Sequence, residues 1–218
     1  MSGVFDVDAS TVGGGGGASA LHASTVGGGA GGASALPHGG VGGSALFLDL
    51  DGVLADFGAG VRAVCGASPD DIRNKMWPKL AAVPPPGFFA RLAWQAGGRE
   101  LWAFSAPHAP RILTGSPMGA WAAPQKEAWC ARELGAAVPV TVCMKREKAA
   151  RAAALLARAD GRLGGAVLVD DSADAAAAWE AWGGVFVHHV TLARTLARLQ
   201  ELGFPAPAFN GGGGGGKA

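Results

Sequence analysis

The feature that most constrains the fold is a short apolar run that ends in two closely spaced aspartates. Residues 45–48 read Ala-Leu-Phe-Leu, and Asp49-Leu50-Asp51-Gly52 follow directly. An apolar run this short, closed by a glycine, is typical of a buried strand rather than of a helix. Residues two apart in an extended chain point to the same side, so the carboxylates of Asp49 and Asp51 are expected on one face. An exposed turn is the alternative interpretation, but the apolar run that leads straight into it favours a functional site.

Two carboxylates held this close together favour a cation between them. Like charges on one face repel each other unless an opposite charge lies nearby. Mg²⁺ is a hard cation that proteins often hold with one or two carboxylates together with the phosphate oxygens of a substrate. Gly52 suits a sharp turn after the strand, because glycine adopts positive φ angles without steric cost. We therefore expect a Mg²⁺ site at this strand end.

Further along the chain, short apolar runs alternate with helical patterns. Strands are expected at 110–114, 138–143, 165–169 and 184–189, and helices at 57–65, 123–134, 145–159 and 191–202. Strands that are continuously apolar and alternate with helices indicate a parallel sheet covered on both faces. The sequence therefore predicts an α/β, Rossmann-like fold with helices on both faces of the sheet.

Composition divides the chain into three parts. Glycine accounts for 37 of the 218 residues, and it is concentrated in residues 1–43 and at the C-terminal end. Tracts of Gly, Ala and Ser bury too little apolar surface to offset the entropy of ordering. We interpret 1–43 and 205–218 as disordered arms and 44–204 as one domain. Within it, residues 68–105 begin with a Ser-Pro-Asp-Asp helix start and are expected to form a small cap after the first strand.

Charge and cysteine content argue against several functional classes. The net charge of +1 provides no strong field for long nucleic acid or for an anionic membrane surface. The three cysteines form no Cys-x-x-Cys pair, which favours free thiols over disulfides or zinc. The first residues lack a signal-peptide core and carry no Lys or Arg before Arg62. We expect a cytoplasmic protein with neither membrane nor long nucleic acid as a partner; its oligomeric state is not indicated.

Polar residues follow four of the expected strands. Ligands of parallel α/β sheets bind beyond the carboxyl ends of the strands. In chain order, those ends carry Asp49 and Asp51, then Thr114, then Lys148, and then Asp170 and Asp171. The sequence therefore predicts that these groups share one site.

This order of residues resembles the four motifs of the haloacid dehalogenase superfamily of phosphatases. The first motif of that family is Asp-x-Asp-Gly-Val/Thr, which residues 49–53 match. The longer stretch Asp-Leu-Asp-Gly-Val-Leu-Ala-Asp-Phe at 49–57 is most similar to the 5'(3')-deoxyribonucleotidase branch. Pro-Gly-Phe-Phe at 86–89 and Gln-Lys-Glu-Ala-Trp at 125–129 are also similar to segments of that branch. The resemblance covers residues 44–190.

The resemblance implies a Mg²⁺-dependent phosphomonoester hydrolase that forms an aspartyl-phosphate. It implies that Asp49 is the nucleophile and that Asp51 is the general acid and base. Mg²⁺ would be held by Asp49, by the main-chain carbonyl of Asp51 and by one carboxylate of the pair Asp170 and Asp171. Neighbouring residues at a strand end point opposite ways, so we expect one of this pair, Asp171, to bind the ion directly.

The resemblance also implies groups that bind the substrate. Thr114 and the main-chain N–H groups of Gly115 and Ser116 would bind phosphate oxygens. Phe57 and Phe89 would lie near a substrate base, because aromatic faces stack on any base. The expected substrate is a small phosphorylated molecule, with a nucleoside monophosphate as one candidate.

Three lysines compete for the role of neutralising charge on the transferring phosphate oxygens. The run from Cys143 to Lys148 resembles the Thr-Arg-Asp-Lys segment of the family with Lys148 in register, so Lys148 is preferred over Lys145. Lys126 stands in the first turn of a helix, where its charge opposes the macrodipole. We therefore expect Lys126 to face an anion too and count it among the substrate-binding residues.

Two alternatives stay open. The substrate could be a sugar phosphate or another small phosphoester, since Met118-Gly119-Ala120 stands where the nucleotidase branch carries a lysine. The chain could also be a non-catalytic binding module that keeps the fold. The complete set of acidic residues, together with Lys148, argues against this second alternative.

Overall fold

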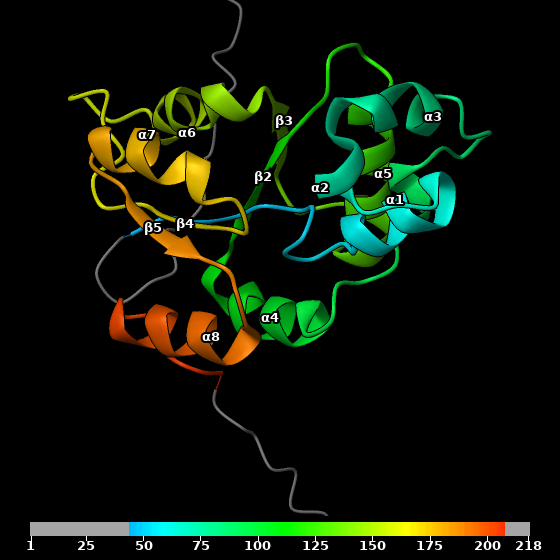
Figure 1. Cartoon of the computed structure of the whole chain (residues 1–218). Coiled ribbons are helices and arrows are strands. Elements are labelled where there is room, and N and C mark those ends of the chain that lie inside the picture. The colour runs from blue at the N-terminus through cyan, green and yellow to red at the C-terminus, as the bar shows by residue number, and fades with distance from the viewer. Residues whose placement is uncertain (1–43, 208–218) are drawn as a thin grey trace, which may run out of the picture. The chain divides into compact units, whose positions relative to one another are not determined.

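The computed structural model describes residues 44–207 and contains a five-stranded parallel sheet (Figure 1). The sheet has the order β3-β2-β1-β4-β5. Its strands are β1 (Leu46–Leu48), β2 (Arg111–Gly115), β3 (Val140–Cys143), β4 (Val167–Asp170) and β5 (Val185–His188). At the centre of the sheet, Phe47 is in register with Arg111 on one side and with Leu168 on the other. The expected parallel α/β sheet is confirmed.

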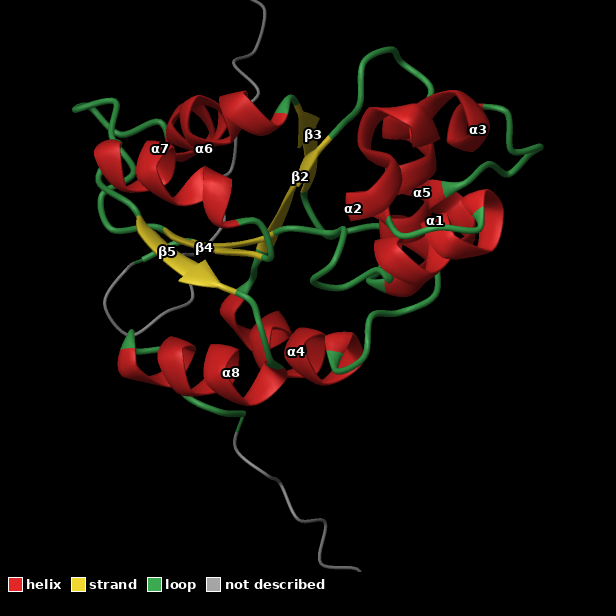
Figure 2. Ribbon diagram, viewed as in Figure 1, coloured by secondary structure: helices red, strands yellow, loops and turns green. Residues whose placement is uncertain are grey.

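Helices cover both faces of this sheet, as Figure 2 shows. The helices that pack on the sheet are α4 (Gly98–Ser105), α5 (Ala122–Glu133), α6 (Lys148–Leu156), α7 (Ala176–Ala181) and α8 (Leu192–Glu201). Leu46 and Leu48 of β1 belong to a core cluster with side chains of α4, α5 and α8. Phe47, between them, belongs to a second cluster that includes side chains of α6 and α7. The alternation along β1 therefore places one hydrophobic core on each side of the sheet.

The helices between β1 and β2 lie in two different parts of the domain. Helices α1 (Phe57–Cys65), α2 (Pro69–Ile72) and α3 (Trp77–Ala81) gather beside α5 (Figure 1). The Ser68 hydroxyl accepts the N–H of Asp71, which confirms the helix start expected there. Helix α4 packs instead against α8 below the sheet. Residues 98–105, which the sequence assigned to the cap, thus belong to the layer that covers the sheet.

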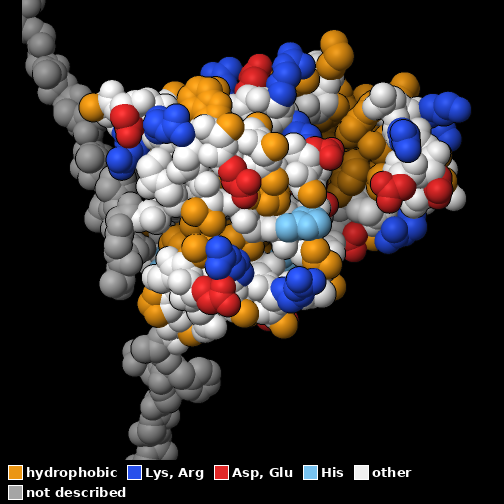
Figure 3. Space-filling view, turned by 60° about the vertical axis from the view of Figure 1, so that its left-hand side comes forward, with side chains coloured by type: hydrophobic (Ala, Val, Ile, Leu, Met, Phe, Trp, Pro, Cys, Tyr) orange, Lys and Arg blue, Asp and Glu red, His pale blue; other side chains and the backbone are white. Residues whose placement is uncertain are grey.

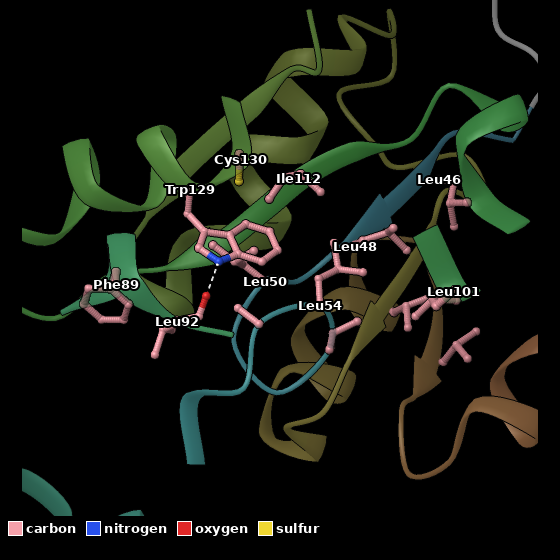
Figure 4. Close-up of a cluster of buried hydrophobic side chains, with 14 of the residues drawn as sticks. Leu46, Leu48, Leu50, Leu54, Phe89, Leu92, Leu101, Ile112, Trp129 and Cys130 are labelled. Atoms are coloured by element: carbon pink, nitrogen blue, oxygen red, sulfur yellow. Dashed lines mark hydrogen bonds between the residues drawn. The ribbon is translucent and has the colours of Figure 1, made fainter. Parts of the chain in front are cut away.

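A fully buried hydrogen bond joins α5 to the segment between β1 and β2 inside the larger core cluster. Trp129 is fully buried, and its Nε1–H donates to the carbonyl of Leu92 at 2.8 Å (Figure 4). The indole nitrogen therefore has a partner although the ring lies among apolar side chains. Short 3₁₀ turns complete the described chain at Arg73–Met76, Phe89–Arg91, Ala106–His108, Lys145–Glu147 and Ala173–Ala175.

Most element boundaries agree with the sequence to within a few residues, and two differences have clear causes. The fourth strand begins at Val167 rather than at residue 165, because Gly164 and Gly165 have positive φ angles that a strand does not accommodate. Helix α6 ends at Leu156 rather than near 159, where Ala157 adopts a left-handed conformation. No helix within 44–207 is both long enough and apolar enough to cross a membrane. The two predicted arms fall outside the described residues, apart from 205–207.

Candidate functional site

Three carboxylates converge at the carboxyl ends of β1 and β4. Asp49, Asp170 and Asp171 each offer one oxygen atom, and these atoms lie within 4.8 Å of one another. The pairing of the two strands causes this proximity: the N–H of Asp49 donates to the carbonyl of Val169 at 2.8 Å. The sequence expectation that residues from two separate strands share one site agrees with these positions.

Lys148 connects two of these carboxylates. Its Nζ lies 2.6 Å from Asp170 Oδ2 and 3.0 Å from Asp49 Oδ1, and its side chain is only 4% exposed. Burial alone would lower the pKa of Lys148, but the charges of Asp49 and Asp170 more than offset that effect and raise its pKa. The lysine therefore stays positively charged beside the predicted nucleophile. Lys145, the competing candidate, is exposed and bonds to Ser172 and Asp174 instead.

Lys126 forms a buried hydrogen-bond network with Asp51 and the end of β2. This fully buried side chain projects from α5, and its Nζ donates to Asp51 Oδ2 at 2.5 Å, to the Gly115 carbonyl at 2.7 Å and to Thr114 Oγ1 at 3.0 Å. An ammonium group has three protons, and these partners use all of them. The anion that the sequence predicted for Lys126 is thus Asp51, and no donor of Lys126 is left for a phosphate.

The two neighbouring aspartates at the end of β4 differ in their surroundings. Asp170 is buried, and its two oxygens accept from Lys148 and from the N–H of Ser172. Asp171 is exposed, and its side chain accepts no hydrogen bond within residues 44–207. Its carboxylate lies against Gly52, where a Cβ atom would fall on Asp171 Oδ2. The predicted direct metal ligand is therefore the member of the pair with free lone pairs.

The charge balance of the site fits a divalent cation. Four carboxylates face two lysines, so full ionisation of the carboxylates would leave two negative charges uncompensated. Asp49 Oδ1 and Asp51 Oδ1 are buried without a hydrogen-bond donor in the described part of the chain; the contact of Asp49 with Lys148 is an ion pair without hydrogen-bond geometry. Burial raises the pKa of Asp51, although Lys126 opposes this rise. The pKa of Asp171 is raised to about 7. The largest cause is the partial removal of water from its carboxylate by neighbouring atoms, and the charge of Asp49 comes second.

The expected phosphate-binding segment needs one correction. Thr114 is buried and contacts Lys126 through its hydroxyl oxygen. The N–H of Ser116 donates to the carbonyl of Cys143 at 2.8 Å, because the pairing of β2 with β3 continues past Gly115. The main-chain N–H of Ser116 is thus not free to bind a phosphate oxygen. The sequence could not show this, since it depends on how far the two strands stay paired.

The aromatic residues expected near a substrate base are packed against each other. Phe89 is 1% exposed. Its ring stacks on Phe57 at a centroid distance of 6.1 Å, lies 5.5 Å from Trp121 and is covered by the Lys126 ammonium group at 4.4 Å. Phe57 is half-buried in the same cluster, where it also contacts Phe88. The faces of Phe89 are therefore occupied by protein.

In chemical terms, the arrangement combines a carboxylate beside a buried lysine, a second carboxylate held by another lysine, and a third carboxylate with free lone pairs. Such a set can hold a divalent cation and stabilise a dianion next to a nucleophile. No family model matches the chain, and no curated protein matches it either.

Proposed function

We propose that this protein is a Mg²⁺-dependent phosphomonoester hydrolase that works through an aspartyl-phosphate. The observation that carries the proposal is the convergence of Asp49, Asp170 and Asp171 within 4.8 Å, with Lys148 in ion-pair contact with the first two. The residues fit Mg²⁺, with Asp49, the Asp51 carbonyl and Asp171 as the residues that would hold it. When bound, this ion supplies positive charge that offsets the charge of the phosphate.

The chain's own carboxylates can complete both halves of the reaction. The carboxylate of Asp49 attacks phosphorus, the bond from phosphorus to the alcohol oxygen breaks, and Asp51 gives its proton to that oxygen. Asp51 then takes a proton from a water molecule, whose oxygen attacks phosphorus. The bond from phosphorus to Asp49 breaks and inorganic phosphate is released. The raised pKa of Asp51 supports its role as the proton carrier, because it makes this carboxylate easier to protonate than a free aspartate.

The two buried lysines have different tasks in this proposal. Lys148 lies next to Asp49 and would neutralise charge on the transferring oxygens. Lys126 holds Asp51 and Thr114 in place, because its three protons bond to these residues and to the Gly115 carbonyl. Lys148 is thus assigned to stabilising the charge of the substrate, and Lys126 is assigned to holding the general acid Asp51 in position.

Hydrolysis of p-nitrophenyl phosphate by the full chain in the presence of Mg²⁺ tests the function. The wild type should release p-nitrophenol, and Asp49→Asn should lose this activity by a factor of about 10³ or more. Asp174→Asn is the matched control, since Asp174 is 86% exposed and lies outside the carboxylate cluster. Wild-type protein that binds beryllofluoride with Mg²⁺ but turns over none of a panel of phosphomonoesters would instead identify a binding module.

A further inference from the structure

A cavity of about 660 Å³ opens beside the carboxylate cluster. Gly52 and Asp171 form one wall, and the remaining walls come from the start of α1, the segment before α4 and the segment after β5. Its volume lies in the range of known small-molecule sites, about 300–1,000 Å³. A phosphate held at the carboxylate cluster would therefore have space for the rest of its molecule at this wall.

The lining of the cavity offers a cation and two positioned imidazoles. Arg62 projects from α1 and forms no ion pair within residues 44–207, and the nearby Asp56 carboxylate accepts the N–H of Ala59 as the helix cap. His188 Nε2 lies 3.0 Å from the main-chain oxygen of Asp171. His189 is 9% exposed, and its Nδ1 lies 2.8 Å from a threonine hydroxyl of α8. These contacts hold both rings in place, and Arg62 keeps its donors available.

The lining contains no phenylalanine or tryptophan on which a base could stack. Phe57 and Phe89, the residues expected to contact a base, pack against each other instead, and Phe89 is buried. On the described residues, the cavity is built from hydrogen-bonding groups together with small and aliphatic side chains. Within the described chain, the imidazoles of His188 and His189 are the only ring faces in the lining, and His189 is only 9% exposed, so this composition favours a polar ligand over a nucleoside.

We propose that the cavity binds the alcohol part of the phosphomonoester and that Arg62 selects substrates with a second anionic group, a carboxylate or another phosphate. A guanidinium group binds such an anion through two parallel hydrogen bonds. Among the described residues, Arg62 is the only arginine or lysine of the lining; of the two carboxylates there, Asp56 caps α1 through one oxygen and Asp171 faces the cation site. The inference deepens the proposed function and rests on it.

Two phosphomonoesters with the same carbon skeleton test this selection. 3-Phosphoglycerate carries a carboxylate where glycerol 3-phosphate carries a hydroxymethyl group. Adenosine 5'-monophosphate is the third ligand and represents an alcohol part with an aromatic base. Calorimetry with the full-length Asp49→Asn chain and excess Mg²⁺ measures binding without turnover. We expect 3-phosphoglycerate to bind about 10- to 100-fold more tightly than glycerol 3-phosphate, as a hydrogen-bonded charge contributes.

Variants of Arg62, placed in the Asp49→Asn chain, assign the preference to this residue. Arg62→Gln should reduce the ratio of the two dissociation constants to about threefold or less, and Arg62→Lys should give an intermediate ratio, since the charge remains without the planar fork. Arg151→Gln, an exposed arginine on α6 outside the cavity, should keep the wild-type ratio.

Three outcomes would overturn the inference: an unchanged ratio in Arg62→Gln, tighter binding of adenosine 5'-monophosphate than of 3-phosphoglycerate, or no binding of any of the three. Hydrolysis of p-nitrophenyl phosphate by the wild type tests the function separately. Turnover of p-nitrophenyl phosphate without a preference for the carboxylate would refute the role of Arg62 and leave the hydrolase intact. Arg62 is exposed, so its variants should fold, and their circular dichroism and unfolding temperatures verify this.

Discussion

Lys126 and Asp51 form a buried ion pair behind the carboxylate cluster, although 75 residues separate them in the chain. The side chain of Lys126 has no exposed surface, and that of Asp51 is 24% exposed. A charge in this position is stable only while its partner is present, because neither group can be fully solvated. The pair therefore couples the stability of the domain to the position of the proposed general acid.

Replacement of Lys126 by methionine should destabilise the protein by about 3 kcal/mol, because Asp51 Oδ2 and the Gly115 carbonyl lose their donor. Unfolding in urea measures this loss. Lys145→Met is the control, since Lys145 is 47% exposed and its pair with Asp174 should contribute less than about 1 kcal/mol. Lys126→Met combined with Asp51→Asn should be less destabilised than the two single changes added together. Additive effects would show that the ion pair carries no such coupling.

The sequence allowed only part of the arrangement of charged groups, on the surface and in the interior, to be predicted. Figure 3 shows basic and acidic side chains interspersed on one face, which agrees with the expected lack of a strong field. The apolar run before Asp49 predicted both the strand and its polar end, because burial and strand period act locally. The partner of Lys126 could not be predicted, because it depends on how α5 packs beside β1. The same holds for the Ser116 N–H and for the aromatic cluster that covers Phe89.

Lys148 and Lys145 are close in sequence, and their effects on activity should differ strongly. Lys148→Met removes the cation that lies 3.0 Å from Asp49 Oδ1, so kcat for p-nitrophenyl phosphate should fall by about 10²- to 10³-fold. Lys145→Met should change kcat by less than about threefold, because Lys145 bonds to surface groups outside the cluster. Steady-state kinetics at saturating Mg²⁺ measures both values. Equal losses in the two variants would contradict the assignment of Lys148.

Mg²⁺ should stabilise the wild type, because the proposed carboxylate site is present in the folded protein and not in the unfolded chain. At a concentration 100 times its dissociation constant, the gain is about 2.7 kcal/mol, visible as a rise in unfolding temperature. Asp171→Asn should lose most of this rise, since Asp171 is the carboxylate without protein partners. Asp174→Asn should keep it. A full Mg²⁺ response in Asp171→Asn would place the ion elsewhere.

Glu133 should make stability depend on pH below neutrality. Hydrogen bonds from Arg132 Nε and from Trp94 Nε1 lower the pKa of Glu133 below its ordinary value of 4.5. A carboxylate with a lowered folded-state pKa contributes stability above its unfolded pKa and loses it as pH falls through the folded pKa. The unfolding free energy of the wild type should therefore fall more steeply below about pH 4.5 than that of Glu133→Gln.

Urea unfolding between about pH 6 and pH 3 gives both slopes. Glu100→Gln is the control, because Glu100 is exposed and forms no ion pair in the described part of the chain. Identical slopes in the wild type and Glu133→Gln would show that the contacts of Glu133 do not favour its charged form.

Gly52 and Gly66 form a matched pair that separates backbone strain from a collision at the cation site. Both have a φ of +74°, so alanine at either position should cost about 1–2 kcal/mol. At Gly66 a Cβ meets nothing within 4 Å, whereas at Gly52 it falls on the carboxylate of Asp171. Gly52→Ala should therefore be the more destabilising change and should also displace Asp171. We expect it to reduce both the Mg²⁺-induced rise in unfolding temperature and the turnover of p-nitrophenyl phosphate, whereas Gly66→Ala keeps both. If the two variants respond to Mg²⁺ alike, the position of the Asp171 carboxylate beside Gly52 is not the one that binds the ion.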